Sequence, residues 1–316
     1  MLLPLTVVLL GLAALLWSAE RFVGAAAATA QRAGMSTLLV GMTVVALGTS
    51  APEMVVSTVA ALDGIPDLAT GNALGSNIAN IGLVLGVTAL VVPIPVRFSI
   101  VRRELPLLLG ATGLAGYALA NGVLGRFDAL FLLLLLVFSL WWLFRADTPD
   151  APAPGTVPDM TLPRALAWLA LSLLALLAGS RAVVWGASEL ARGLGVSELV
   201  IGLTVVAIGT SLPELVACVA SALKRHHDIA IGNVIGSNLF NLLAVLPIPG
   251  LLAPGPSDPA AAGRDYPVML ALTLALGMLL LWQRRGRIGR LPGALLVAGY
   301  LGYLAWVAGA SLGAAP

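Results

Sequence analysis

Two short segments of the chain place an acidic residue beside a proline inside long apolar runs. GTSAPE occupies residues 48–53 and GTSLPE occupies residues 209–214. Of the 15 acidic residues, only Glu53 and Glu214 lie deep within such runs. Placing one carboxylate in the middle of a membrane costs about 2.5–3.5 kcal/mol on insertion scales. Neither run contains a Lys or Arg, so these residues predict a bound cation as the partner, or a proton when no cation is bound.

The prolines explain how further oxygen ligands could arise beside each acid. Pro52 has no N–H and its ring clashes with the carbonyl group of Gly48, four residues earlier; Pro213 has the same relation to Gly209. A freed carbonyl group in a membrane is tolerated where it lines a polar cavity. We therefore expect a broken helix at each site. Hydroxyl groups lie within one turn of each Glu, on Thr49, Ser50, Thr210 and Ser211.

The apolar run that follows each acid carries a second polar pattern, GNxxGSNxxN. In the first copy Asn72, Ser76 and Asn80 are spaced by four residues, so they share one face of a helix. The second copy supplies Asn233, Ser237 and Asn241. Carboxylate, amide, hydroxyl and carbonyl oxygens suit hard cations, and Ca²⁺ takes about six to eight of them. No cluster of His or Cys in the sequence suggests a softer metal.

The composition indicates which elements hold these residues. The 316 residues are 59% hydrophobic and 10% charged, against roughly 25% charged residues in a soluble domain. A membrane-spanning helix needs about 20 apolar residues. We predict an all-α membrane protein with ten transmembrane helices, near residues 1–19, 36–62, 68–93, 105–121, 127–144, 163–180, 197–223, 229–253, 267–283 and 291–311.

The two halves of the chain are related in sequence. An alignment without a gap lays Gly41–Asn80 on Gly202–Asn241, with 21 identities in 40 positions. This predicts a first five-helix repeat over 1–145, a Pro- and Asp-rich linker over 146–162 and a second five-helix repeat over 163–316. Because five is odd, the repeats are expected to be inverted. In this repeat alignment Cys218 takes the place of Ser57 and is interpreted as a small packing residue.

The loop charges give the orientation of the predicted helices. Loops on the side of the termini carry four basic residues, which include Arg181, and loops on the other side carry thirteen, which include Arg21. The positive-inside rule then puts both termini outside and the linker in the cytoplasm. In the second repeat Pro247 and Pro249 are expected to bend the eighth helix or to end it early.

GTSxPE followed by GNxxGSNxxN, present twice across ten predicted helices, resembles the cation/calcium antiporter superfamily and within it the prokaryotic sodium/calcium exchangers. The resemblance implies alternating access, with the first and sixth helices sliding over the other eight. It also implies that the acids, the hydroxyl groups and the amides above line central ion sites, together with the carbonyl groups of Ala46 and Ala207. Several family members carry Asp at the position of Asn241, so the site here has two formal negative charges and not three.

We therefore predict a secondary antiporter of a prokaryotic plasma membrane that exchanges Ca²⁺ for Na⁺. Its partners are inorganic cations and lipid, with no nucleic acid, no obligatory protein partner and no cofactor. Exchange of Ca²⁺ for H⁺ is the nearest alternative, and Asn241 favours it. A cation channel is a further alternative. An enzyme is disfavoured, because no nucleophile–base pair, His-based metal motif or nucleotide-binding loop appears in the sequence.

Overall fold

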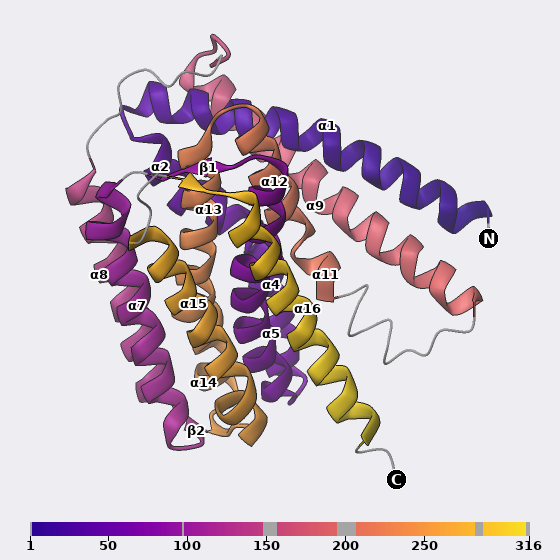
Figure 1. Cartoon of the computed structure of the whole chain (residues 1–316), viewed down its shortest axis with the longest axis vertical. Helices are drawn as coiled ribbons and strands as arrows, with labels where there is room; N and C mark the ends of the chain where they lie inside the picture. Colours follow the sequence, from indigo (N-terminus) through magenta and orange to yellow (C-terminus); the bar gives the residue numbers. More distant parts are fainter. Residues whose placement is uncertain (1, 97, 148–156, 195–206, 282–286, 314–316) are drawn as a thin grey trace.

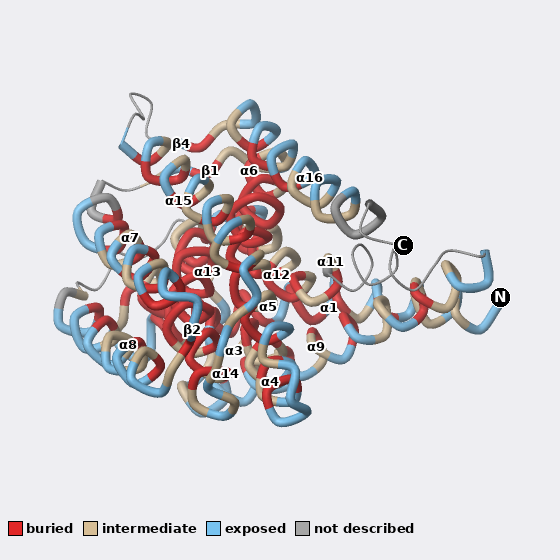
Figure 2. The backbone as a smooth tube through the Cα atoms, turned by 90° about the horizontal axis from the view of Figure 1, so that it is seen from below, coloured by how far each residue is buried: buried red, intermediate tan, exposed pale blue. Residues whose placement is uncertain are grey.

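Two densely buried helical segments form the centre of the molecule and the other helices surround them. The computed structural model describes residues 2–96, 98–147, 157–194, 207–281 and 287–313. One central segment joins α5, η2 and α6 over 66–91, and the other joins α13, η4 and α14 over 227–252, where η denotes a π-helical turn. Within these segments 72% and 94% of the most apolar stretch is buried, against 22% for α1, so the polar residues they carry face protein. Figure 2 shows this concentration of buried residues.

The first half of the chain contains the following elements: α1 (Leu2–Ala33), α2 (Thr37–Val40), η1 (Gly41–Val45), α3 (Ala46–Thr49), α4 (Ala51–Leu62), α5 (Pro66–Ala79), η2 (Asn80–Leu85), α6 (Gly86–Val91), β1 (Ile94–Pro95), α7 (Phe98–Ala120), β2 (Val123–Leu124) and α8 (Arg126–Ala146). The second half contains α9 (Leu162–Gly193), α11 (Ala207–Thr210), α12 (Leu212–Leu223), α13 (His227–Phe240), η4 (Asn241–Val245), α14 (Pro247–Leu252), β3 (Gly255–Pro256), η5 (Ala261–Asp265), α15 (Tyr266–Leu281), β4 (Arg287–Ile288) and α16 (Arg290–Gly313).

The protein is an all-α membrane protein. Among the described residues seven helices are long and apolar enough to span a membrane, or eight if the pair 37–49 and 51–62, bent by 42°, counts as one span. Large apolar side chains stay exposed on the outer helices, for example Phe127 at 91% and Leu134 at 68%. Such a surface suits lipid. The predicted seventh span lies partly outside the described residues, because 197–206 are not among them.

Several elements of the first half recur in the second half with equivalent bounds under the repeat alignment. The elements α3, α4, α5, α6 and β1 correspond in this way to α11, α12, α13, α14 and β3. Gly64 and Arg225 are also equivalent, and both have a positive φ, of 77° and 63°. Two short antiparallel strand pairs are also present, in which β1 pairs with β4 and β2 pairs with β3. Each pair therefore joins one half of the chain to the other, and the pairs lie at opposite ends of the view in Figure 1.

The helices α1 and α9 pack against each other along the side of this core (Figure 1). Glycines bring their backbones together: a Cβ atom on Gly179 would lie 3.1 Å from the carbonyl oxygen of Gly11. Both helices extend beyond the predicted apolar segments 1–19 and 163–180, so the prediction that Arg21 and Arg181 lie in loops is wrong. The helix continues past Arg21 because residues 25–28 are alanines, and alanine favours helix most strongly.

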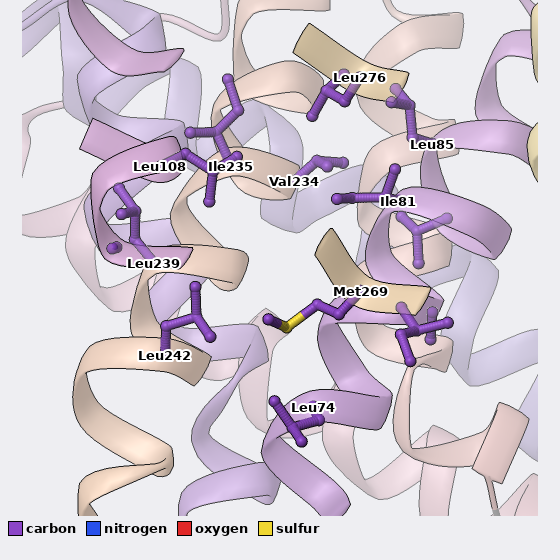
Figure 3. Close-up of a cluster of buried hydrophobic side chains, with 14 of the residues drawn as sticks. Leu74, Ile81, Leu85, Leu108, Val234, Ile235, Leu239, Leu242, Met269 and Leu276 are labelled. Carbon is purple, nitrogen blue, oxygen red and sulfur yellow. The ribbon is translucent and has the colours of Figure 1, made fainter. Parts of the chain in front are cut away.

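Apolar side chains hold the two central segments together. Figure 3 shows Leu74 and Ile81 of the first segment beside Val234 and Leu242 of the second, with Met269 of α15 between them. All five are buried. This packing fixes the rotation of α5 and α13 about their axes, and thereby the direction in which the polar residues of the same helices face.

The prediction that Pro247 and Pro249 end the eighth helix early is wrong. The helix α14 starts at Pro247 and ends at Leu252, the residue equivalent to the last residue of α6. Pro247 occupies the first turn after the π-helical turn η4. A proline is tolerated there because the missing N–H has no necessary partner in a first turn.

A close contact between two helix backbones at the core yields a stability prediction. A Cβ atom on Gly236 of α13 would lie 2.3 Å from the carbonyl oxygen of Met42 and 2.7 Å from the Cβ of Ala46. Since neither atom can move without its backbone, we expect Gly236→Ala to destabilise the protein by about 1–3 kcal/mol, measured by thermal unfolding in detergent. Gly299→Ala is the matched control, because the nearest atom to its Cβ would be 3.9 Å away. Equal stability of the two variants would contradict this close approach.

Candidate cation site

Glu53 and Glu214 occupy equivalent places at the start of two helices. Each is the third residue of its helix, α4 or α12, and each is only 1% exposed. The preceding residues, Ser50 and Ser211, leave helical geometry with ψ values of 2° and 3°. A proline follows two residues later in the first turn, where its fixed φ favours a new helix start. The predicted helix break is therefore present, and each break sets an acid in the interior.

Two hydrogen bonds connect the halves of the chain at these breaks. The Ser50 hydroxyl donates to Oε1 of Glu214 at 3.4 Å. The Thr49 hydroxyl donates to Oδ1 of Asn233 at 3.2 Å. The carboxyl groups of Glu53 and Glu214 are close enough to interact electrostatically. Residues that are far apart in sequence thus form one polar cluster, which is what the predicted two-carboxylate site requires.

Many polar atoms of this cluster have no hydrogen-bond partner within the protein. They include Oε2 of both acids and, on the helices α5 and α13 and their π-helical turns, Asn80 Nδ2, Ser237 Oγ, Asn241 Oδ1, Asn238 Oδ1 and both polar atoms of Asn77. Each residue is at most 2% exposed. A buried polar group without a partner costs about 1–3 kcal/mol. So many unpartnered atoms on the two acids and on the central helices indicate an interior built to hold a polar or charged ligand.

The π-helical turns begin at predicted ligands. Asn80 starts η2 and Asn241 starts η4. A π-helical turn changes the hydrogen-bond register of the backbone, and such turns occur often at functional sites. Ser76 and Ser237, one turn earlier, are buried at 5% and 0%. Five of the six residues predicted on these helices are thus buried, and the sixth, Asn72, is half-buried.

Asn72 and Asn233 form hydrogen bonds between neighbouring helices. Asn72 Nδ2 donates to the carbonyl oxygen of Glu53 at 3.1 Å and to Ser57 Oγ at 2.9 Å. Asn233 Nδ2 lies 3.2 Å from the sulfur of Cys218, the residue equivalent to Ser57. Ser57 and Cys218 in turn donate to the carbonyl oxygens of Ala69 and Ala230. These bonds fix each acid-bearing helix on its neighbour.

The interpretation of Cys218 as a packing residue was therefore incomplete. Its pairing with Asn233 repeats that of Ser57 with Asn72, and the repeat alignment carried the signal. We expect Cys218→Ser to keep both bonds and to leave ion exchange within twofold of the parent. Cys218→Val is expected to leave Asn233 Nδ2 without a partner and to lower the stability by about 1–3 kcal/mol, measured by thermal unfolding. Equal stability of the two variants would contradict the role of the bond.

The prolines were expected to leave carbonyl groups near the breaks without hydrogen-bond partners, but two of these groups have partners. The carbonyl oxygen of Gly209 accepts a hydrogen bond from Ser180 of α9 at 2.9 Å, so that group does not lack a partner. The carbonyl oxygen of Ala46 accepts from the backbone N–H of Ser50 at 2.9 Å and from the Thr49 hydroxyl at 3.4 Å. Ala207 is the first residue of α11, and its side chain lies outside the described set.

A cavity of about 640 Å³ lies beside the site on one side. It lies between α9 and the two helix breaks, and its lining includes Pro52, Thr210 and Pro213. Of the predicted ligands, Thr210 lines this cavity, whereas Glu53 and Glu214 do not. Among the described residues no group of three or more His, Cys, Asp or Glu could hold a metal ion. The ligands available here are two carboxylates supplemented by neutral oxygen groups.

A buried polar cluster around two acids in a membrane protein is the arrangement expected of a cation transporter. The family model described as sodium/calcium exchanger protein matches residues 3–145 and 164–309. The chain belongs to this family, which is one of ion antiporters and not of enzymes.

Individual relatives agree with this assignment over nearly the whole chain. The putative antiporter CaxA of Alkalimonas amylolytica is 47% identical over 310 residues, with 94% of this chain and 96% of the relative covered. The sodium/calcium exchanger MaX1 of Methanosarcina acetivorans is 30% identical, with 94% and 96% covered. A solved structure of the sodium-calcium exchanger NCX_Mj matches with a TM-score of 0.84 at 31% identity and covers 96% of this chain and 98% of its own.

Proposed function

We propose that the protein exchanges Ca²⁺ for Na⁺ across the membrane by alternating access. The observation that carries the proposal is the cluster of buried polar atoms without partners around Glu53 and Glu214. Two carboxylates neutralise one Ca²⁺, and the surrounding hydroxyl and amide oxygens supply the further ligands that this ion takes. Na⁺ is also a hard cation, so the two ions compete for the same acids.

The ligand set of this proposal comprises the two acids and neutral oxygen groups from both halves. Pro52 and Pro213 shape the site. The neutral ligands are Thr49, Ser50, Ser76, Asn80, Thr210, Ser211, Ser237 and Asn241, with the amide oxygens of Asn72 and Asn233 and the carbonyl groups of Ala46 and Ala207. Ala46 is fully buried at the first break.

Exchange follows from the charge of the site. An empty site would carry two negative charges through a medium of low dielectric constant, which is unfavourable by several kcal/mol. A site that holds a cation carries little net charge. Loaded forms therefore cross between the two sides, and the bare form does not.

The same proposal includes two inverted five-helix repeats, of 1–145 and 163–316, joined by a cytoplasmic linker at 146–162. It is supported by the element bounds that recur under the repeat alignment and by the two strand pairs at opposite ends of the molecule. Both termini then lie outside a plasma membrane, as the loop charges favour. The relative YrbG of Escherichia coli, 44% identical, is described as an inner membrane protein.

Counter-ion specificity is tested with purified protein in vesicles loaded with Ca²⁺. We expect an inward Na⁺ gradient to drive Ca²⁺ out at constant pH, and a pH gradient without Na⁺ to be far less effective. The reverse result would replace Na⁺ by H⁺ as the counter-ion. Asn241 is the feature that favours H⁺ as the counter-ion. With Asn in place of the Asp of several family members, the site has two formal negative charges and not three.

A further inference from the structure

Two crevices flank the core at positions related by the internal repeat. One is the 640 Å³ cavity beside the site, whose wall on α9 includes Leu177, Ser180 and Arg181. The other, of about 380 Å³, lies between α1 and α12, and its wall on α1 consists of the equivalent residues Leu16, Ala19 and Glu20. The first crevice reaches Thr210 and Pro213 at the site, whereas the lining of the second extends from Leu215 to Lys224 on α12. Of these two crevices, only the larger therefore extends to the helix breaks.

An ion pair lies at the smaller of the two crevices. Lys224 Nζ lies 3.2 Å from Oε1 of Glu20 and also donates to the Glu20 carbonyl oxygen at 3.2 Å. Glu20 belongs to α1, and Lys224 is the C-terminal cap of α12. The pair therefore joins one of the two outer helices to an acid-bearing helix of the core. Both residues line the crevice.

The equivalent positions in the other half carry the opposite charges. The repeat alignment, continued along the chain without a gap, relates Glu20 to Arg181 and Lys224 to Asp63. Asp63 is the C-terminal cap of α4, as Lys224 is of α12. Both Arg181 and Asp63 are described and exposed, and they form no ion pair with each other. Arg181 instead lines the open 640 Å³ cavity.

We propose that these four residues form two ionic latches that close in alternate states of the transporter. The Glu20–Lys224 latch keeps the smaller crevice from widening toward the site while the larger cavity extends to the helix breaks. When α1 and α9 shift to expose the site on the other side, this latch opens and Arg181 meets Asp63. The inference rests on the proposed alternating access. It adds residues outside the cation site that set the balance between the two states.

The test measures how fast a cysteine in the smaller crevice reacts with a hydrophilic maleimide. The reporter is Val216→Cys, on the wall of that crevice, in the Cys218→Ser background at fixed ion concentrations. Its labelling rate is expected to rise with the population of the minor state, in which this crevice is wider. We expect Glu20→Gln and Lys224→Gln each to raise the rate about two- to fivefold, the effect of losing one exposed ion pair. Asp63→Asn is expected to lower it by a similar factor, because it removes the latch of the minor state.

The two glutamine variants change the local charge in opposite senses. If the charge change acted only on the reactivity of the thiol, the two labelling rates would move in opposite directions, and this result would overturn the proposal. Unchanged labelling rates in Glu20→Gln, Lys224→Gln and Asp63→Asn would also overturn it. The charge-reversed pair Glu20→Lys with Lys224→Glu is expected to return the rate toward that of the parent. Glu189→Gln is the control, since it breaks an ion pair within α9 alone. Labelling requires no ion gradient, so a failure of the latches is distinguishable from a failure of Ca²⁺/Na⁺ exchange.

Discussion

Glu53→Gln and Glu214→Gln are each expected to abolish exchange, with a loss of at least about 100-fold in Ca²⁺ flux. Either change leaves one charge where the ion needs two. A single carboxylate at about 4 Å contributes roughly 4 kcal/mol per unit charge of the ion at an effective dielectric constant of 20. Folding is expected to persist, because glutamine fills the same space and a buried charge is removed. The measurement is Ca²⁺ efflux from vesicles, together with calorimetric binding to the purified variants.

Glu104→Gln is the matched control for these variants. Glu104 is also buried, at 6% exposure, and its Oε2 likewise has no partner. It belongs to α7, however, and not to the broken helices. Exchange is expected to continue in this variant. Retained exchange in both Glu53→Gln and Glu214→Gln would exclude the two-carboxylate site. Loss of exchange in Glu104→Gln would show that the effect of removing a buried carboxylate is not specific to this site.

Asn241→Asp is expected to strengthen Ca²⁺ binding by about tenfold or more at alkaline pH. Asn241 is 1% exposed, its Oδ1 has no partner, and it starts the π-helical turn η4. A third carboxylate there raises the number of formal negative charges in the site from two to three. Its Coulomb attraction to an ion within a few ångströms is worth several kcal/mol before the cost of desolvation is subtracted. Calorimetric titration with Ca²⁺ measures the change.

The neutral variant Asn241→Ser separates charge from geometry in that experiment. It shortens the side chain without adding charge, so it is expected not to strengthen Ca²⁺ binding. Unchanged or weaker binding by Asn241→Asp at alkaline pH would indicate that the side chain does not face the ion.

The centre of the candidate site was predictable because its residue types conflict with their surroundings. An acid next to a proline in an apolar run carries a cost, and a second copy in register shows that the cost is retained for a purpose. The structure buries Glu53 and Glu214. It links the first break to Glu214 through Ser50 and to Asn233 of α13 through Thr49. The repeat alignment therefore carried most of the information.

Other features left no such mark on the sequence. The π-helical turns at Asn80 and Asn241 change the hydrogen-bond register of the backbone and require no special residue type. The ends of α1 and α9 were predicted too early because Arg21 and Arg181 were interpreted as the start of loops. A long cationic side chain can lie along a helix and reach a polar region with its head group, so one Arg does not end a helix.

Obligatory coupling is the claim on which the proposed mechanism depends most directly. Vesicles that contain the purified protein are loaded with Ca²⁺ and diluted into buffer without Na⁺, without external Ca²⁺ and without a pH gradient. The account predicts that Ca²⁺ stays inside under these conditions and leaves rapidly when Na⁺, or H⁺ for the second candidate, is added outside. Rapid loss of Ca²⁺ down its gradient with no cation supplied on the other side would show that the bare site crosses the membrane, and would contradict exchange.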